Sequence, residues 1–305
     1  MSNGVRIPRY PELHASGELA RRAAEALTGL STCHVCPHGC AVDRLAGERG
    51  VCRAGALARV SSVGPHFGEE PPLVGRGGSG TVFFTLCNLH CVFCQNYDIS
   101  QLGHGEDVSA AELADIFLDM QRTGCENLNL VSPTHFAPQI LEALDIAASR
   151  GLELPLVWNT GGYESLATLA LLDGVVDVYM PDVKYADPTT AARLSGAADY
   201  PELAFAALRE MHRQVGDLEL DDRGIARRGL LVRHLVLPGG LAGTPEVMTF
   251  LAEEISRDTY VNVMDQYRPC HRAGEHPELT RRITAEEYAE ARGAARAAGL
   301  HRFAR

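Results

Sequence analysis

The sequence predicts an α/β fold built on a parallel sheet. Short apolar or β-branched runs alternate along the chain with segments that have the periodicity of amphipathic helices. Parallel strands need long crossover connections, usually helices, so this alternation favours a parallel sheet wound in one hand. Periodicity leaves open whether the sheet is an open doubly wound sheet or a full or partial barrel. The expected strands cover residues 81–86, 128–131, 154–158, 175–180, 230–237 and 260–264.

The helical segments between these runs begin and end at residues that cap helices. In the clearest segment, Ser109 and Glu112 form a predicted capping box and Gly124 ends the helix. An apolar stripe with helical spacing lies between them. Further helices are expected to end at Gly151, to run from Pro201 through Met211, and to begin at Thr244 and Pro245. The last is expected to open with a capping box of Thr284 and Glu287 and to end at Gly299.

Composition and charge narrow the class of protein. The chain has 305 residues, of which 46% are hydrophobic, and this is enough for one large core. A net charge of -11 without clustered Lys and Arg argues against a nucleic-acid partner. No apolar run approaches the roughly 20 residues of a membrane span, and no N-terminal apolar stretch resembles a signal sequence. With nine cysteines, the chain is expected to be a cytoplasmic protein whose cysteines bind metal.

Three cysteines directly after the first expected strand are the most informative residues. Cys87, Cys91 and Cys94 have the spacing C-x3-C-x2-C, and the strand would deliver their thiolates together at its C-terminal end. Thiolates select iron-sulfur clusters, zinc or copper(I), and a structural zinc ion uses four protein ligands. Three cysteines therefore leave one position open for a small molecule. The alternative is a zinc knuckle or a reduced, buried group of cysteines.

This spacing, with Phe93 just before the third cysteine, resembles the cluster loop of the radical S-adenosylmethionine (radical SAM) superfamily. The resemblance implies a 4Fe-4S cluster held by Cys87, Cys91 and Cys94. It also implies that SAM binds the open iron with Phe93 near its adenine. For the fold, it implies a partial (β/α)6 barrel.

Polar residues follow the expected strands at the ends where parallel α/β proteins place their active sites. Each alone has an ordinary explanation, because Asn, Asp and Gly begin turns, and Asp182 with Lys184 could form only a structural ion pair. Polar groups at all six ends favour a binding site for SAM. The candidates are Ser132, Thr134, Asn159, Asp182, Lys184 and Arg233.

Within the superfamily, the chain looks most like the branch of pyruvate formate-lyase activating enzyme, including its PflX-type relatives with N-terminal cysteines. By this likeness, Lys184 would bind the methionyl carboxylate of SAM, and Asp182 a cation or the ammonium group. Asn159 and Arg233 would line the same pocket.

Three departures from the family pattern limit this likeness. The Gly-Gly-Glu segment for the SAM ammonium is absent, so Ser132 or Thr134 and local carbonyl groups would have to bind it. Asn159 stands where the activating enzyme has an acidic residue. The extra cysteines come before the cluster loop rather than after it, which weakens any assignment of a glycyl-radical enzyme as the target.

Four of these extra cysteines lie close together near the N-terminus. Their spacing is C-x2-C-x3-C-x11-C, which suggests a closed metal site in a reducing compartment. A second iron-sulfur cluster is favoured over structural zinc, because zinc sites usually pair two C-x2-C knuckles. The four residues are Cys33, Cys36, Cys40 and Cys52.

The sequence thus predicts two parts. Residues 1–77 would form an N-terminal helix, a small cysteine-rich metal-binding module and a linker, and residues 78–305 the barrel. The stretch 64–80, rich in glycine and proline, is interpreted as the linker into the barrel.

The resemblance implies an enzyme that reductively cleaves SAM at the 4Fe-4S cluster to a 5′-deoxyadenosyl radical, which abstracts hydrogen from a substrate. A protein or peptide substrate, as for an activating enzyme, would need a broad mouth framed by residues 64–80 and 217–228. A small-molecule substrate would instead meet Tyr163, His234 and Arg268. The expected partner is an electron donor of the flavodoxin or ferredoxin type. The alternative is a non-catalytic iron-sulfur or zinc protein that transfers electrons or acts as a scaffold.

Overall fold

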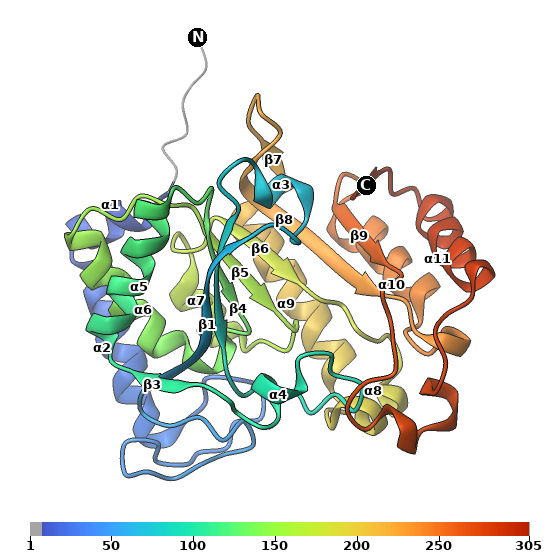
Figure 1. Cartoon of the computed structure of the whole chain (residues 1–305), viewed down its shortest axis with the longest axis horizontal. Coiled ribbons are helices and arrows are strands. Elements are labelled where there is room, and N and C mark those ends of the chain that lie inside the picture. Colours follow the sequence, from blue (N-terminus) through green and yellow to red (C-terminus); the bar gives the residue numbers. More distant parts are fainter. Residues whose placement is uncertain (1–7, 305) are drawn as a thin grey trace.

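The computed structural model describes residues 8–304, and its centre is a sheet of parallel strands (Figure 1). The six expected strands all form. They are neighbours in the order β2, β4, β5, β6, β8, β9, each parallel to the next, which confirms the predicted α/β class. Their bounds are β2 Ser79–Phe84, β4 Leu128–Val131, β5 Leu156–Thr160, β6 Val178–Pro181, β8 Ala226–Leu235 and β9 Tyr260–Met264.

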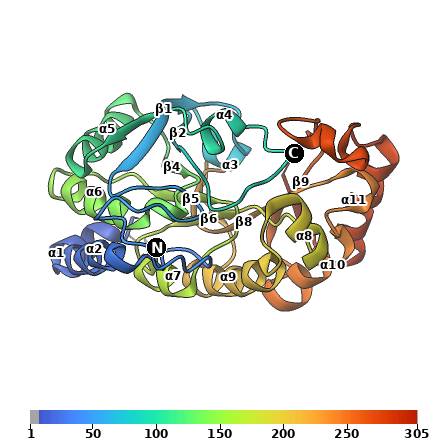
Figure 2. The same cartoon turned by 90° about the horizontal axis from the view of Figure 1, so that it is seen from below.

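The helices that connect these strands wrap around the outside of the sheet (Figure 2). Both predicted capping boxes form: the Ser109 and Thr284 side chains each accept a hydrogen bond from the backbone of the residue three positions on. The strands therefore line the inside of a partial barrel. The outer helices are α5 Ala110–Thr123, α6 Ala137–Ser149, α7 Leu166–Leu172, α8 Pro188–Ser195, α9 Tyr200–Val215, α10 Thr244–Phe250 and α11 Ala285–Ala297.

The barrel does not close, because its two edge strands pair with further strands instead of with each other. On one side, β1 (Ala58–His66) runs antiparallel to β2, and β3 (Glu106–Val108) runs antiparallel to β1. On the other side, β10 (Arg302–Phe303) runs parallel to β9. The sequence patterns predicted none of these three strands.

The segment predicted as a linker is instead part of the barrel. Residues 64–66 belong to β1, and the helix α3 (Pro71–Val74) follows. Leu73 of α3 is fully buried and packs against Met180 and Leu231, whose strands line the barrel. The linker interpretation is therefore wrong, and we call α3 with the preceding residues 67–70 the plug.

The hairpin at residues 217–228 lies at the opposite end of the strands from the cysteine loop. Its strand β7 (Glu219–Leu220) pairs with the first residues of β8, and the hairpin stands beside α3 at the top of Figure 1. The hairpin therefore does not border the cysteine loop, although Leu220 of β7 lines the larger of the two cavities described below.

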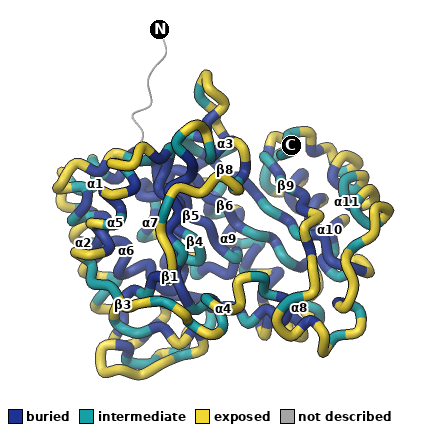
Figure 3. Tube along the Cα trace, in the orientation of Figure 1, coloured by how far each residue is buried: buried dark blue, intermediate teal, exposed yellow. Residues whose placement is uncertain are grey.

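The N-terminal helices α1 (Tyr10–Ala15) and α2 (Glu18–Thr28) pack against α6. One hydrophobic core joins Leu19 of α2 to Leu144 of α6, and buried residues run through the whole sheet (Figure 3). The division of the chain near residue 77 stays a prediction. Within residues 8–304, we find no helix with the length and hydropathy needed to cross a membrane. The remaining elements are short: η1 Gly29–Thr32, α4 Tyr97–Ser100, η2 Thr134–Phe136, η3 Pro238–Gly240, the π-helix η4 Leu251–Ile255, η5 Ala273–Glu275 and η6 Pro277–Leu279.

Candidate active site at the ends of the barrel strands

The cysteine loop leaves the end of β2 and is anchored to the barrel. The backbone N–H groups of His90 and Val92 donate to carbonyl oxygens at the end of α8, at 3.1 and 2.9 Å. Cys87, Cys91 and Cys94 are all free thiols. The loop therefore holds three cysteines in fixed positions over the barrel.

The surroundings of the three thiols are mostly apolar. Burial raises the pKa of Cys87 to about 12 and also raises the pKa of Cys91, although Lys184 opposes the shift at Cys91. Ser195 lies 3.0 Å from the sulfur of Cys91. Phe93 is buried and makes edge contacts with aromatic rings, at 5.9 Å from Tyr267 between centroids. Phe93 thus forms part of the wall beside the cysteines.

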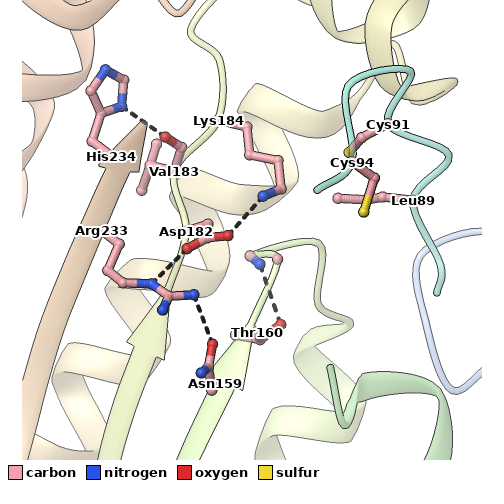
Figure 4. A network of polar contacts seen from close by, with 12 residues as sticks. Leu89, Cys91, Cys94, Asn159, Thr160, Asp182, Val183, Lys184, Arg233 and His234 are labelled. Atoms are coloured by element: carbon pink, nitrogen blue, oxygen red, sulfur yellow. Dashed lines mark hydrogen bonds and ion pairs between the residues drawn. The ribbon is translucent and has the colours of Figure 1, made fainter. Parts of the chain in front are cut away.

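A charged group made by residues just after β6 and near the end of β8 faces the cysteine loop (Figure 4). Lys184 Nζ donates to Asp182 Oδ2 and Arg233 Nε donates to Asp182 Oδ1, both at 2.8 Å. Arg233 Nη2 also donates to Asn159 Oδ1, at 2.8 Å. In Figure 4, Lys184 lies between Asp182 and the cysteine loop. The structure therefore brings together four of the predicted residues from three neighbouring strands.

The charged side chains of this group stabilise one another's ionised forms. Burial alone would raise the pKa of Asp182, but Arg233 and Lys184 together lower it to about 2. Burial would lower the pKa of Lys184, but Asp182 and the neighbouring Cys91 raise it instead. Asp182 and Lys184 are therefore both charged at neutral pH.

One property of Lys184 is visible in the sequence itself. It is the only lysine among the 28 lysine and arginine residues of the chain. An ammonium group is a compact point charge, whereas arginine offers a planar fork of donors. The single lysine of the chain, just after an expected strand, is a signal that the sequence alone could have supplied.

Two other predicted residues lie apart from this group. Thr134 donates to Glu164 Oε1 at 2.7 Å, and the backbone N–H of Ser132 donates to the carbonyl oxygen of Asn159 at 2.8 Å. Neither Ser132 nor Thr134 lines the cavities described below. The structure therefore does not bring them to the space beside the cysteines.

Glu164 is a buried acid that the sequence patterns did not identify. Its Oε1 also accepts hydrogen bonds from Thr160 and Trp158, at 2.5 and 3.0 Å. Burial raises its pKa, and these donors oppose the shift. The signal available in the sequence was a single acidic residue in the turn after the third expected strand, two residues after a pair of glycines. Glu164 ties the ends of β4 and β5 together.

Two adjoining cavities lie beside the charged group. The smaller has a volume of about 240 Å³ and is lined by Cys91, Phe93, Cys94, Asp182, Lys184 and Arg233. The larger has a volume of about 1130 Å³ and reaches the plug, β9 and β10. Both include Asn96, Arg233, Met264 and Gln266 in their walls, so the two spaces are neighbours.

The residues predicted to contact a small-molecule substrate do not line either cavity. His234 is fully buried, points away from the charged group in Figure 4, and lies 2.7 Å from the carbonyl oxygen of Val183. Tyr163 donates to Asp199 at 2.8 Å, and Arg268 is exposed. The prediction of a pocket made by Tyr163, His234 and Arg268 is therefore wrong.

Two glycines allow the end of β5 to lie close to both the cysteine loop and the charged group. A Cβ atom at Gly161 would lie 3.2 Å from the Leu89 side chain on the cysteine loop and 3.6 Å from Lys184. Gly162 has φ +82°, and a Cβ atom there would lie 2.5 Å from the carbonyl oxygen of Asp182. Side chains at these positions would push apart the elements that carry the cysteines and the charged group.

The four N-terminal cysteines lie in a segment without helix or strand that packs against the same end of the barrel. Cys33, Cys36 and Cys52 are buried, and Cys40 is half-buried. His38 Nε2 lies 2.8 Å from the carbonyl oxygen of Asn88, next to Cys87. In residues 8–304, no group of three or more His, Cys, Asp or Glu side chains has the arrangement of a site for a single metal ion. The segment nevertheless touches the cysteine loop directly.

Comparison with known proteins identifies the family. Residues 81–217 match the radical SAM superfamily. Uncharacterized protein MJ0674 from Methanocaldococcus jannaschii is 36% identical to this chain over 269 residues, which cover 85% of this chain and 72% of the relative. The chain belongs to the radical SAM superfamily.

Solved structures of SuiB from Streptococcus suis show a more distant likeness. SuiB bound to the precursor peptide SuiA has a TM-score of 0.48 and 12% identity, and SuiB bound to S-adenosylmethionine has 0.48 and 13%. The matches cover 72% of this chain and 46% and 48% of the SuiB chains, so this chain spans about half their length. A likeness of this size carries no argument about ligands or substrates here.

Members of the radical SAM superfamily use a 4Fe-4S cluster and SAM, and the residues present fit both. Three free thiols on one anchored loop are the soft donors that iron takes, and they leave one iron open. Beside them lie a fixed ammonium group, a carboxylate and a guanidinium group, which match the charges of a zwitterionic amino acid such as the methionyl part of SAM.

Proposed function

We propose that Cys87, Cys91 and Cys94 hold the 4Fe-4S cluster and that SAM binds in the smaller cavity beside them. Once bound, the cluster and SAM would supply one-electron cleavage of SAM and abstraction of hydrogen from a substrate, the chemistry of the superfamily. The observation that carries the proposal is the position of Lys184, which lies between the cysteine loop and Asp182 (Figure 4).

In this proposal the protein supplies charge and geometry. The Lys184 ammonium group holds the carboxylate of SAM, and its ion pair with Asp182 fixes its position before SAM arrives. Arg233 and Asn159 hold Asp182 from the other side. Phe93 forms an apolar wall for the adenine, and the buried surroundings keep water away from the reacting groups.

We assign the substrate to the larger cavity, which adjoins the smaller one at Arg233 and Met264. Its volume of about 1130 Å³ exceeds the range of roughly 300–1,000 Å³ that is usual for small ligands. A peptide segment, as for an activating enzyme, or a sizeable small molecule therefore fits this space. A flavodoxin- or ferredoxin-type protein would supply the electrons.

We further propose that Cys33, Cys36, Cys40 and Cys52 bind a second iron-sulfur cluster or a zinc ion. Four cysteines complete a closed set of ligands, which leaves no position for a substrate. Metal analysis of the full chain and of a Cys36→Ala variant separates the choices. Loss of about four irons indicates a second cluster, loss of one zinc indicates a structural ion, and no loss of either metal contradicts this site.

Iron content and spectroscopy of anaerobically reconstituted protein test the main site. We expect a Cys87/Cys91/Cys94→Ala variant to lose about four irons relative to the native chain. We also expect SAM to change the electron paramagnetic resonance spectrum of the reduced native protein, because SAM binds the open iron. Cys125→Ala is the matched control, since Cys125 is buried in the turn before β4 and has no assigned role. Equal iron in both variants would contradict the proposal.

A further inference from the structure

The larger cavity has an acidic wall that the proposed chemistry of SAM does not use. Glu69 and Glu70, the last residues of the plug before α3, line this cavity together with Arg233 and Asn262. These two glutamates come from the segment predicted as a linker, and the burial of Leu73 in the barrel holds that segment in place. The acidic wall therefore belongs to the fixed part of the fold.

Glu70 has an incomplete set of partners. Its residue exposure is only 6%, and Oε1 accepts a hydrogen bond from Asn262 Nδ2 at 3.0 Å. Its Oε2 is buried and has no hydrogen-bond partner among residues 8–304. A buried carboxylate oxygen without a donor costs roughly 1–3 kcal/mol or more, so a missing partner is expected.

The neighbouring groups do not neutralise this wall. Arg233 Nη1 lies 3.9 Å from a carboxylate oxygen of Glu69 and of Glu70, while its shorter hydrogen bonds go to Asp182 and Asn159. Glu69 Oε1 lies 3.1 Å from His66 Nδ1. Burial raises the pKa of Glu69, and Arg233 opposes this shift only in part. Three carboxylates, from Glu69, Glu70 and Asp182, thus share Arg233, while Lys184 pairs with Asp182 and His66 with Glu69.

We propose that Glu69 and Glu70 bind a positively charged nitrogen group, an ammonium or guanidinium, on the substrate. Such a group would donate to the carboxylate of Glu70, which lines the cavity, and balance the third carboxylate. It would also orient the substrate in the larger cavity, with the remainder extending toward Arg233 and the SAM cavity. This inference rests on the proposed function, because it takes the larger cavity as the place of the substrate.

Ligand-observed NMR titration of the full chain tests the site directly. The probes are n-butylammonium, the neutral n-butanol and the anionic butyrate, which controls for Arg292 and Arg302 on the far wall. We expect n-butylammonium to bind at least tenfold more tightly than the other two. We expect Glu70→Gln and, separately, Glu69→Gln to weaken its binding at least tenfold. Glu253→Gln, the same change at an exposed position of η4, is expected to leave it within twofold.

Several results would overturn the inference. These are equal binding of butanol, tighter binding of butyrate, or the same n-butylammonium affinity in Glu70→Gln and Glu253→Gln. Circular dichroism establishes that each variant is folded, and Glu69→Gln stands in if Glu70→Gln does not fold. A parallel fall in SAM affinity in Glu70→Gln would also overturn it, because the carboxylates would then serve the ammonium group of SAM.

A lysine peptide, compared with n-butylammonium, distinguishes the source of the cation. Tighter binding of acetyl-Gly-Lys-Gly-amide than of n-butylammonium assigns it to a protein substrate, and equal binding assigns it to a small amine; both support the site. SAM cleavage, measured on the same preparation, separates this inference from the function on which it rests. Cleavage without binding of n-butylammonium contradicts the acidic site alone, and binding without cleavage contradicts the proposed function alone.

Discussion

The two ends of strand β6 carry aspartates in opposite electrostatic surroundings. Asp182 follows the strand and contacts Lys184 and Arg233 at 2.8 Å, which lowers its pKa to about 2. Asp177 precedes the strand, and its Oδ2 accepts a hydrogen bond from the backbone N–H of Leu156 at 2.8 Å. Burial raises the pKa of Asp177 to about 7. The same residue type is therefore held charged at one end and favoured as the neutral acid at the other.

This contrast shows that burial has different electrostatic consequences at the two ends of the barrel. At the N-terminal ends of the strands, the plug and the Asp177 hydrogen bond fill and close the barrel. At the C-terminal ends, opposite charges are assembled in advance, so a charged ligand meets groups that need little reorganisation. Both aspartates are buried, so the positions of the neighbouring cations decide the difference between their pKa values.

The largest effect on stability is expected at Gly162, at the C-terminal end of β5. We expect Gly162→Ala to lower the free energy of unfolding by about 3 kcal/mol, because φ is +82° and the new Cβ would lie 2.5 Å from the Asp182 carbonyl oxygen. Gly151→Ala, before β5, is the control, since φ is +88° but no atom lies within 4 Å. It should cost about 1 kcal/mol. Chemical denaturation measures both, and equal losses would show that the site end is not tightly packed.

A pH series sharpens the comparison of the two aspartates. The folded pKa of Asp177 lies above its unfolded value of 3.8, so its contribution to stability is complete below pH 3.8 and is lost as pH rises through about 7. Between pH 4.5 and pH 8, Asp177→Asn should gain on the order of 2 kcal/mol in unfolding free energy relative to the native chain. Asp182→Asn should show a constant difference over this range, because the contribution of Asp182 is lost only as pH falls through about 2. Urea titrations at both pH values check this, and identical profiles would contradict the assigned surroundings.

Lys184 tests the charged end of the comparison. Lys184→Ala should weaken SAM binding about tenfold or more, since a hydrogen bond to a charged group contributes roughly 1.5–3 kcal/mol. Lys184→Arg should recover part of the affinity, because the charge remains. Arg268→Ala, an exposed change in the loop after β9, is the control and should stay within twofold. Equilibrium dialysis with labelled SAM gives the three affinities; a normal value for Lys184→Ala would remove Lys184 from the site.

The smallest effect is expected from the hairpin at the N-terminal ends of the strands. The exposed Arg223 forms an ion pair with the mostly buried Glu126 at 2.8 Å. Arg223→Ala should cost less than about 1 kcal/mol of stability and leave SAM affinity within twofold. A larger change in affinity would mean that the two ends of the barrel are coupled.

Local sequence patterns predicted the elements whose signals are local. The six parallel strands and the two capping boxes depend on runs of neighbouring residues, and they form as expected. The plug could not be predicted in this way, because a segment rich in glycine and proline has the composition of a linker. Its burial comes from the barrel interior that Leu73 fills.

The candidate site also has a part that the sequence could predict and a part that it could not. Asp182, Lys184, Arg233 and Asn159 meet because the ends of parallel strands meet, which the order of the elements implies. The conformation of the turn after β4 could not be predicted. Ser132 adopts φ +57°, and the Thr134 hydroxyl donates to Glu164. Such side-chain pairings depend on loop conformation and on partners far along the chain.

Formation of 5′-deoxyadenosine tests the central claim most directly. Anaerobically reconstituted protein is given SAM and a strong reductant, and the product is compared among the native chain, Cys91→Ala and Cys125→Ala. We predict product from the native chain and from Cys125→Ala, and at least about a thousandfold less from Cys91→Ala. Absence of product from native protein that holds its iron, with and without an added lysine peptide, would contradict the claim and favour an iron-sulfur protein that only carries electrons.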